Sequence, residues 1–115
     1  MGGKSAAIVL DDVAKDTERF NDLIDWIMFG VFLGNGQACS ATSRLLLHSS
    51  VAPVLLPRLI AAVEAVKIGD NMDPEARLGP LIGKTQQTKV LGFIRRALDA
   101  GVSSATGDGS FAGDR

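Results

Sequence analysis

The chain has 115 residues and a formal net charge of −1, with 46% hydrophobic and 22% charged residues, a balance typical of one packed globular domain and not of a disordered segment. Its basic and acidic residues are spread along the chain, so no basic stripe predicts a nucleic-acid partner or a membrane surface. The single cysteine excludes an internal disulfide. Since neither a signal peptide nor an apolar run long enough to span a bilayer is recognisable, we expect a cytoplasmic protein.

A short apolar run near the N-terminus predicts the first strand. Residues Ala6 to Leu10 are apolar and partly β-branched, which is typical of a parallel strand that is covered on both faces. Asp11 and Asp12 end this run. We interpret them as a solvated turn between a strand and a helix, not as a catalytic pair of carboxylates.

The next segment has the period of a helix. From about Asp16, apolar residues recur at steps of three and four, which predicts a helix with one buried face. This stripe consists of Phe20, Leu23, Ile24, Ile27, Met28, Val31 and Phe32. Because Trp26, Phe29 and Leu33 widen the stripe, we expect the C-terminal half of the helix to be buried on most sides. Residues 34–36, which tolerate a positive φ, end the helix.

A second strand and a second helix follow. The apolar run Arg44 to His48 predicts the strand. Ser50 and Pro53 mark the start of the helix, and Pro57 indicates that this helix begins after Pro53 or is bent. Its apolar face consists of Leu55, Leu56, Leu59, Ile60, Val63 and Val66.

The remaining residues predict a loop, a helix and a strand. Residues 69–83 contain three glycines and two prolines, which is typical of a loop. A helix is predicted from about Thr85 to Ala100, with Gly101 as its stop. Val102 to Thr106 is a candidate third strand. The predicted buried face of the helix consists of Val90, Leu91, Ile94, Ala97 and Leu98.

Strands and helices therefore alternate along the chain, which predicts an α/β fold with a parallel sheet. Three strands would form a small sheet with two long open edges. A piece of a larger sheet explains this pattern better than a complete domain does.

The polar segment between the first helix and the second strand contains the lone cysteine, Cys39. Glycines ahead of a cysteine allow the backbone to turn sharply, and a helical turn after it would direct N–H groups and a positive dipole end at the sulfur, which favours the thiolate. The same N–H groups can hold an oxyanion formed by attack on a carbonyl. On residue type alone, a lone cysteine between apolar helices is more often an inert core residue than a nucleophile.

Three segments resemble the aldehyde dehydrogenase family. Phe32 to Ser43 (FLGNGQACSATS) closely resembles the cysteine signature of that family, in which a glycine and a glutamine precede the nucleophile with one residue between. Gly2 to Ser5 (GGKS) resembles the end of the family's Glu-Leu-Gly-Gly-Lys-Ser signature, and Arg77 to Ile82 (RLGPLI) is similar to the sequence after its cysteine. The resemblance implies that residues 1–115 are an incomplete part of the Rossmann-like catalytic domain of this family.

The resemblance also makes Cys39 the catalytic thiol. Its thiolate would attack an aldehyde, with the Cys39 N–H as one donor to the oxyanion of the thiohemiacetal. Hydride transfer to NAD or NADP would leave a thioester that water hydrolyses to the carboxylic acid. Gly36 and Gln37 would shape the turn, and the segment Ser40 to Arg44 resembles the branch that oxidises betaine aldehyde and aminoaldehydes. The full-length enzyme is expected to be a homo-oligomer.

The chain also departs from the family's pattern. Met1 stands at the position of the leucine that follows the family's general-base glutamate, so this glutamate is missing and the true N-terminus is expected upstream. Neither the dinucleotide-binding domain nor a cofactor site is expected within this chain, and we expect the isolated chain to be inactive. The alternative is a non-catalytic truncated paralogue that acts in protein association or in thiol chemistry.

Two further residues have a structural interpretation. His48, the single histidine, lies at a predicted strand end and is far in sequence from any cluster of Cys, Asp or Glu, so the sequence predicts no metal site. Lys4 follows two glycines, yet the upstream strand and the glycine spacing of a phosphate-binding loop are missing.

Overall fold

The computed structural model of the chain describes residues 2–15 and 17–107. Its elements are the strand β1 (Ala6–Val9), the 3-10 helix η1 (Asp11–Lys15), the helix α1 (Thr17–Phe32), the 3-10 helix η2 (Leu33–Gly36), the strand β2 (Arg44–Leu47) and the helices α2 (Ala52–Glu64) and α3 (Lys84–Asp99). These bounds confirm two predicted strands and three predicted helices to within one or two residues. The helix α2 begins before Pro53 and contains Pro57, so the later start that Pro57 suggested is wrong.

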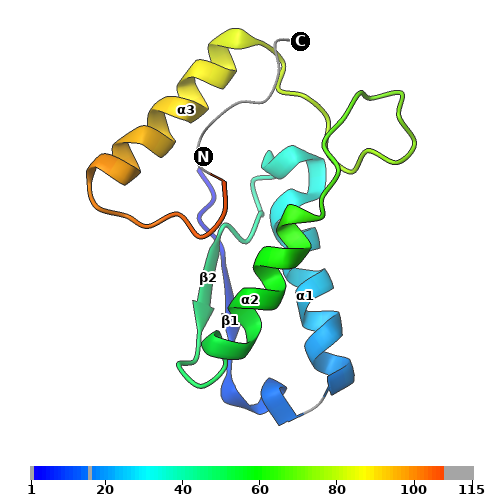
Figure 1. Cartoon of the computed structure of the whole chain (residues 1–115), viewed down its shortest axis with the longest axis vertical. Helices are drawn as coiled ribbons and strands as arrows, with labels where there is room; N and C mark the ends of the chain where they lie inside the picture. Colours follow the sequence, from blue (N-terminus) through cyan, green and yellow to red (C-terminus); the bar gives the residue numbers. More distant parts are fainter. Residues whose placement is uncertain (1, 16, 108–115) are drawn as a thin grey trace.

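The two strands form a parallel sheet, as predicted. In its register Ala6 pairs with Arg44 and Val9 pairs with Leu47. Because α1 connects these parallel strands, they form a βαβ unit. Figure 1 shows α1 and α2 running next to the strands, while α3 stands apart from them. This α/β arrangement around a parallel sheet confirms the predicted fold class.

The core lies between one face of this sheet and the helices α1 and α2. Its buried residues are Val9, Phe20, Ile24, Ile27, Val51 and Leu55, with Leu45 and Leu47 packed against them. Side chains alternate across a strand, so Ile8 and its partner Leu46 point to the opposite face, where they are 67% and 49% exposed. The described residues therefore cover one face of the sheet, and the expectation of cover on both faces is wrong within them.

Two further expectations about burial are wrong. Trp26, Phe29 and Leu33 are exposed, because the core contacts α1 along Phe20, Ile24 and Ile27 and nothing in the described residues covers the other side. On α3, Val90 and Leu91 are partly buried, whereas Ile94, Ala97 and Leu98 are exposed. The reason is visible in Figure 1, where α3 lies away from the sheet and from the other two helices.

The predicted third strand is also wrong. Within residues 102–106 the structure has no strand. The Ser104 hydroxyl donates to the carbonyl oxygens of Thr106 and Gly107, each at 2.8 Å. Such local side-chain bonds compete with a strand ladder, and they follow Gly101, which ends α3 with φ 83° as expected.

Candidate active site around Cys39

Cys39 lies in an exposed turn between η2 and β2. The N–H of Ala41 donates to the carbonyl oxygen of Ala38 (3.1 Å), which places Cys39 and Ser40 at the two central positions of a turn. Cys39 is exposed to solvent. This position confirms the expected turn between the first long helix and the second strand. Within the described residues, Cys39 therefore does not lie in the core.

Upstream, the chain reaches this turn through three left-handed residues. Gly34, Asn35 and Gly36 have φ values of 60°, 59° and 70°, a region in which glycine and asparagine meet the least steric resistance. They end α1 as predicted. The Asn35 side chain is also bonded to Gly79: Nδ2 donates to the Gly79 carbonyl oxygen, and Oδ1 accepts from the Gly79 N–H, both at 3.2 Å.

Downstream, the chain is attached to α1 and to the N-terminal segment. The Thr42 N–H donates to the carbonyl oxygen of Gly30 (3.0 Å), and Nε of Arg44 donates to the carbonyl oxygen of Lys4 (2.8 Å). These bonds lead the backbone directly from the turn into β2. The expectation of a helical turn after Cys39 is therefore wrong.

Gly3 lies directly against the Cys39 backbone. A β-carbon added to Gly3 would overlap the carbonyl oxygen of Cys39, whereas a β-carbon added to Gly2 would meet nothing within 4 Å. The structure thus brings the first of the other two segments singled out in the sequence to the Cys39 turn through Gly3, and the second to Asn35, four residues before Cys39, through Gly79.

Two backbone N–H groups next to the thiol are not used in hydrogen bonds within the described residues. Within residues 2–15 and 17–107, the N–H groups of Cys39 and Ser40 donate to no protein acceptor. Unused N–H groups beside a nucleophile can stabilise the oxyanion that forms when the nucleophile attacks a carbonyl. An exposed thiol with such donors can therefore support nucleophilic catalysis.

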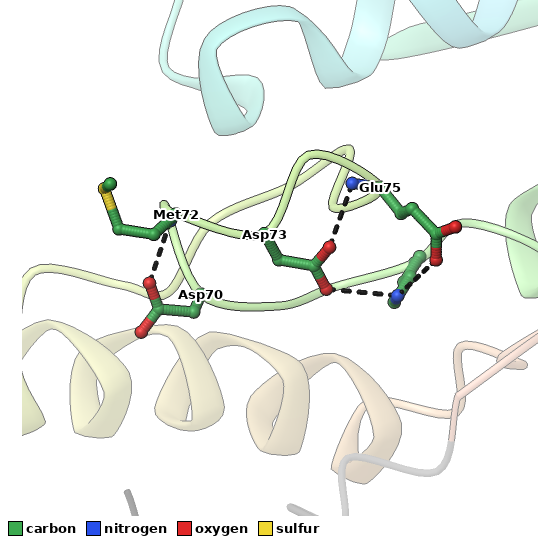
Figure 2. A network of polar contacts seen from close by, with 5 residues as sticks. Asp70, Met72, Asp73 and Glu75 are labelled. Carbon is green, nitrogen blue, oxygen red and sulfur yellow. Dashed lines mark hydrogen bonds and ion pairs between the residues drawn. The ribbon is translucent and has the colours of Figure 1, made fainter.

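The segment that contacts Asn35 belongs to a loop with its own polar network (Figure 2). Lys67 contacts Asp73 at 3.0 Å and Glu75 at 2.8 Å. The Glu75 N–H donates to Asp73 (2.9 Å), and the Met72 N–H donates to Asp70 (2.8 Å). The Glu75 N–H and, to a lesser extent, the Lys67 ammonium lower the pKa of the Asp73 carboxyl. Glu75 and, to a lesser extent, Asp73 raise the pKa of Lys67.

The other residues considered in the sequence lie in structural positions. Asp11 and Asp12 are exposed in η1, and the exposed His48 forms a 2.8 Å contact from Nδ1 to the Ser50 hydroxyl. Among the described residues, no three His, Cys, Asp or Glu side chains form a group that could hold a metal ion. In the same part of the chain, no helix combines the length and the apolar character that crossing a membrane requires.

Comparison with known proteins identifies the family. The sequence pattern of the aldehyde dehydrogenase family matches residues 1–115. The chain belongs to the aldehyde dehydrogenase family. This membership confirms the resemblance of the three segments around Cys39.

Aldehyde dehydrogenases of two plants illustrate the relationship. The chain is 43% identical over 107 residues to a chloroplastic betaine aldehyde dehydrogenase of Beta vulgaris, covering 93% of this chain and 20% of that protein. It is 44% identical over 103 residues to a chloroplastic aminoaldehyde dehydrogenase of Arabidopsis thaliana, covering 90% of this chain and again 20% of the relative. The chain thus spans about a fifth of the length of these curated relatives.

Solved aldehyde dehydrogenases share the fold. An NAD+ complex of the enzyme from Bacillus cereus superposes with a TM-score of 0.85 at 33% identity, covering 98% of this chain and 22% of that one. A double mutant of betaine aldehyde dehydrogenase from Staphylococcus aureus, in complex with NAD+ and with a BME-modified cysteine, gives a TM-score of 0.87 at 29% identity. That match covers 100% of this chain and 22% of the bacterial one.

Sequence reasoning did not find the bonds between Asn35 and Gly79 or the network around Lys67. The sequence did contain one signal for the bonds between Asn35 and Gly79. Asn35 stands between two glycines at a point where a third glycine would turn the chain as easily, which indicates that the Asn35 side chain makes an interaction that glycine could not.

Proposed function

We propose that this chain is the nucleophile-bearing part of an NAD- or NADP-dependent aldehyde dehydrogenase that oxidises an aldehyde to a carboxylic acid, with Cys39 as the nucleophile. The observation that carries the proposal is the exposed Cys39 turn, which Gly3 contacts directly and which follows Asn35, the residue that is hydrogen-bonded to Gly79. Such a turn presents a thiol to an incoming carbonyl compound.

The chemistry assigned to Cys39 is attack on the carbonyl carbon. The thiolate forms a C–S bond, and the carbonyl π electrons move to the oxygen, which becomes an oxyanion. The N–H groups of Cys39 and Ser40 make no hydrogen bond within the described residues and would donate to this oxyanion. Gln37 and Gly36 hold the turn and take no part in the chemistry.

NAD or NADP would accept the hydride in the oxidation. In the described residues the parallel sheet has two strands, and the cavity of about 150 Å³ at the end of α3, lined by Ile94, Leu98 and Val102, is too small for a dinucleotide. We therefore assign hydride transfer to no residue described here.

For the substrate, we propose an aldehyde of the betaine or aminoaldehyde class. Support comes from the two plant relatives, which are named for these aldehydes, and from the segment Ser40 to Arg44. A homo-oligomeric full-length enzyme and a cytoplasmic location stay predictions; the two plant relatives are named as chloroplastic proteins.

Acyl transfer from p-nitrophenyl acetate tests the role of Cys39 without any cofactor. The thiolate attacks the ester carbonyl, p-nitrophenolate leaves, and an acetyl thioester forms on Cys39. We expect the folded chain to release p-nitrophenolate faster than the same chain unfolded in urea, and mass spectrometry to place one acetyl group on Cys39. The Cys39→Ser variant is the control.

Equal rates for the folded chain, the unfolded chain and Cys39→Ser would refute the proposed nucleophile. Fast alkylation of Cys39 by iodoacetamide together with no acyl transfer would favour the alternative, a chain that acts in thiol chemistry. The two reagents therefore separate a reactive thiol from an acyl-transfer site.

A further inference from the structure

The Asn35 side chain satisfies both backbone polar groups of one residue. Nδ2 donates to the carbonyl oxygen of Gly79, and Oδ1 accepts from the N–H of the same residue, each at 3.2 Å. This is the pairing that a neighbouring strand would offer to Gly79. A carboxamide provides a donor and an acceptor in this arrangement, whereas a carboxylate provides acceptors alone. The contact therefore depends on the chemistry of asparagine.

The backbone at position 35 does not itself require asparagine, so the side chain is best explained by its bonds to Gly79. Asn35 is the one non-glycine residue with positive φ among the described residues, and it stands four positions before Cys39. Glycine would adopt the same backbone without a β-carbon. The retained carboxamide is partly buried and bonded over a distance of 44 residues in the sequence.

Gly79 lies close to a second asparagine side chain, that of Asn71. A β-carbon on Gly79 would lie 2.5 Å from Oδ1 of Asn71 and 3.6 Å from Nδ2 of Asn35. A β-carbon at this position would therefore displace the Asn71 side chain, while its distance to the Asn35 amide would be an ordinary van der Waals contact.

The loop that carries Gly79 is itself braced. The Gly69 N–H donates to the carbonyl oxygen of Leu78 (3.0 Å), the Arg77 N–H donates to that of Lys67 (2.9 Å), and Ile68 and Leu78 form an isolated parallel bridge. Figure 2 shows the acidic side chains of this loop engaged in their own contacts. Asn35 thus connects the approach to Cys39 with a segment that has internal support.

We propose that Asn35 is a positioning residue for Cys39, which acts by holding Gly79 through its carboxamide and so fixing the turn that carries the thiol. The inference rests on the proposed role of Cys39 for its functional meaning. The mechanical part, a turn restrained by the two bonds between Asn35 and Gly79, can be measured without any catalysis.

Two variants of Asn35 separate the contributions of its two bonds. Asn35→Gly keeps the left-handed backbone and removes both bonds. Asn35→Asp keeps an acceptor for the Gly79 N–H and removes the donor to the Gly79 carbonyl oxygen. The matched control is Asn71→Asp, because Oδ1 of Asn71 lies 2.5 Å from the place that a β-carbon on Gly79 would take, yet the Asn71 side chain makes no hydrogen bond within the described residues.

The lone cysteine provides the first readout, because a nitroxide spin label attached to the 115-residue chain reports the mobility of the Cys39 turn by EPR. We expect the label to be more mobile in Asn35→Gly, intermediate in Asn35→Asp and unchanged in Asn71→Asp. The second readout is amide hydrogen exchange at Gly79. It should become faster by roughly fivefold in Asn35→Gly, the factor expected for the loss of one ordinary hydrogen bond. Thermal melting should show the same transition for all four proteins, which distinguishes positioning from general destabilisation.

Unchanged label mobility and unchanged exchange in Asn35→Gly would overturn the proposal, as would an Asn71→Asp variant that loosens the turn as much as Asn35→Asp does. Neither result depends on acyl transfer. Failure of Cys39 to accept an acetyl group would refute the proposed function and leave the restraint by Asn35 in place, so the two proposals fail separately.

Discussion

Gly3 and Cys39 are in direct backbone contact, although they belong to different segments of the chain. The carbonyl oxygen of Cys39 occupies the space in which a β-carbon on Gly3 would lie. Any residue other than glycine at this position must move one of the two segments. The glycine therefore determines how closely the N-terminal segment can approach the proposed nucleophile.

Gly3→Ala should destabilise the chain and disturb the Cys39 turn. Backbone atoms cannot rotate away as a side chain can, so we expect a loss of about 1–3 kcal/mol, as in other overpacked positions. Urea unfolding measures the loss, and the EPR spectrum of labelled Cys39 reports the displacement of the turn. Gly2→Ala is the matched control, because a β-carbon there meets nothing within 4 Å. A Gly3→Ala variant as stable as Gly2→Ala would contradict this contact.

Gly30→Ala should destabilise the chain when position 42 is threonine and stabilise it when position 42 is alanine. A β-carbon on Gly30 would lie 2.5 Å from the Thr42 hydroxyl oxygen, so the single variant is expected to lose stability. In a Thr42→Ala background the obstacle is gone, and alanine should stabilise α1 over glycine by about 1 kcal/mol. Urea unfolding of the four proteins in this cycle gives the coupling. Equal effects in both backgrounds would show that Thr42 is not the obstacle.

Acid should open the contact between Asp73 and the Glu75 N–H. The pKa of the Asp73 carboxyl is lowered below its ordinary value of 3.8, so its contribution to stability is present above that value and is lost as the pH falls through the lower pKa of the folded chain. An NMR titration of the Glu75 amide follows this loss. Because the Glu75 N–H is the larger cause, Lys67→Met should raise the Asp73 pKa part of the way to 3.8. A full return would show that Lys67 dominates.

The 115 residues alone should not reduce NAD+ or NADP+ in the presence of betaine aldehyde. Dehydrogenation requires a nicotinamide held against the reacting carbon, and the two-stranded sheet of the described residues is much smaller than a dinucleotide-binding unit. Absorbance at the reduced-nicotinamide band measures the rate, with Cys39→Ser as the control. Steady formation of NADH or NADPH above the control would show that these residues suffice for turnover.

The βαβ unit was predictable from the sequence because its signals are local. The alternation of apolar runs, the helical stripe that begins near Phe20 and the three residues with positive φ that end at Gly36 depend on neighbours in the chain. The Cys39 turn followed from the same signals together with the family resemblance. These features need no knowledge of distant partners.

The errors concern contacts between distant segments. Periodicity identifies an apolar face, such as that of Trp26 and Phe29, but it does not say whether another part of the structure covers that face. The bonds between Asn35 and Gly79 connect residues 44 positions apart, a pairing that no local pattern encodes. The helical turn expected after Cys39 failed for the same reason, since the Thr42 N–H is bonded to Gly30 instead.

Asn35 is followed directly by Gly36, and this order makes Asn35 prone to spontaneous deamidation. A glycine places no side chain in the way of its own backbone nitrogen, which can attack the carboxamide carbon of the preceding asparagine and expel ammonia to give a cyclic succinimide. Water then opens the succinimide to aspartate or isoaspartate. Deamidation of stored protein at this position would thus remove the donor to Gly79 without any mutation. Peptide mapping of aged samples would measure the fraction of Asn35 that is deamidated as storage time increases.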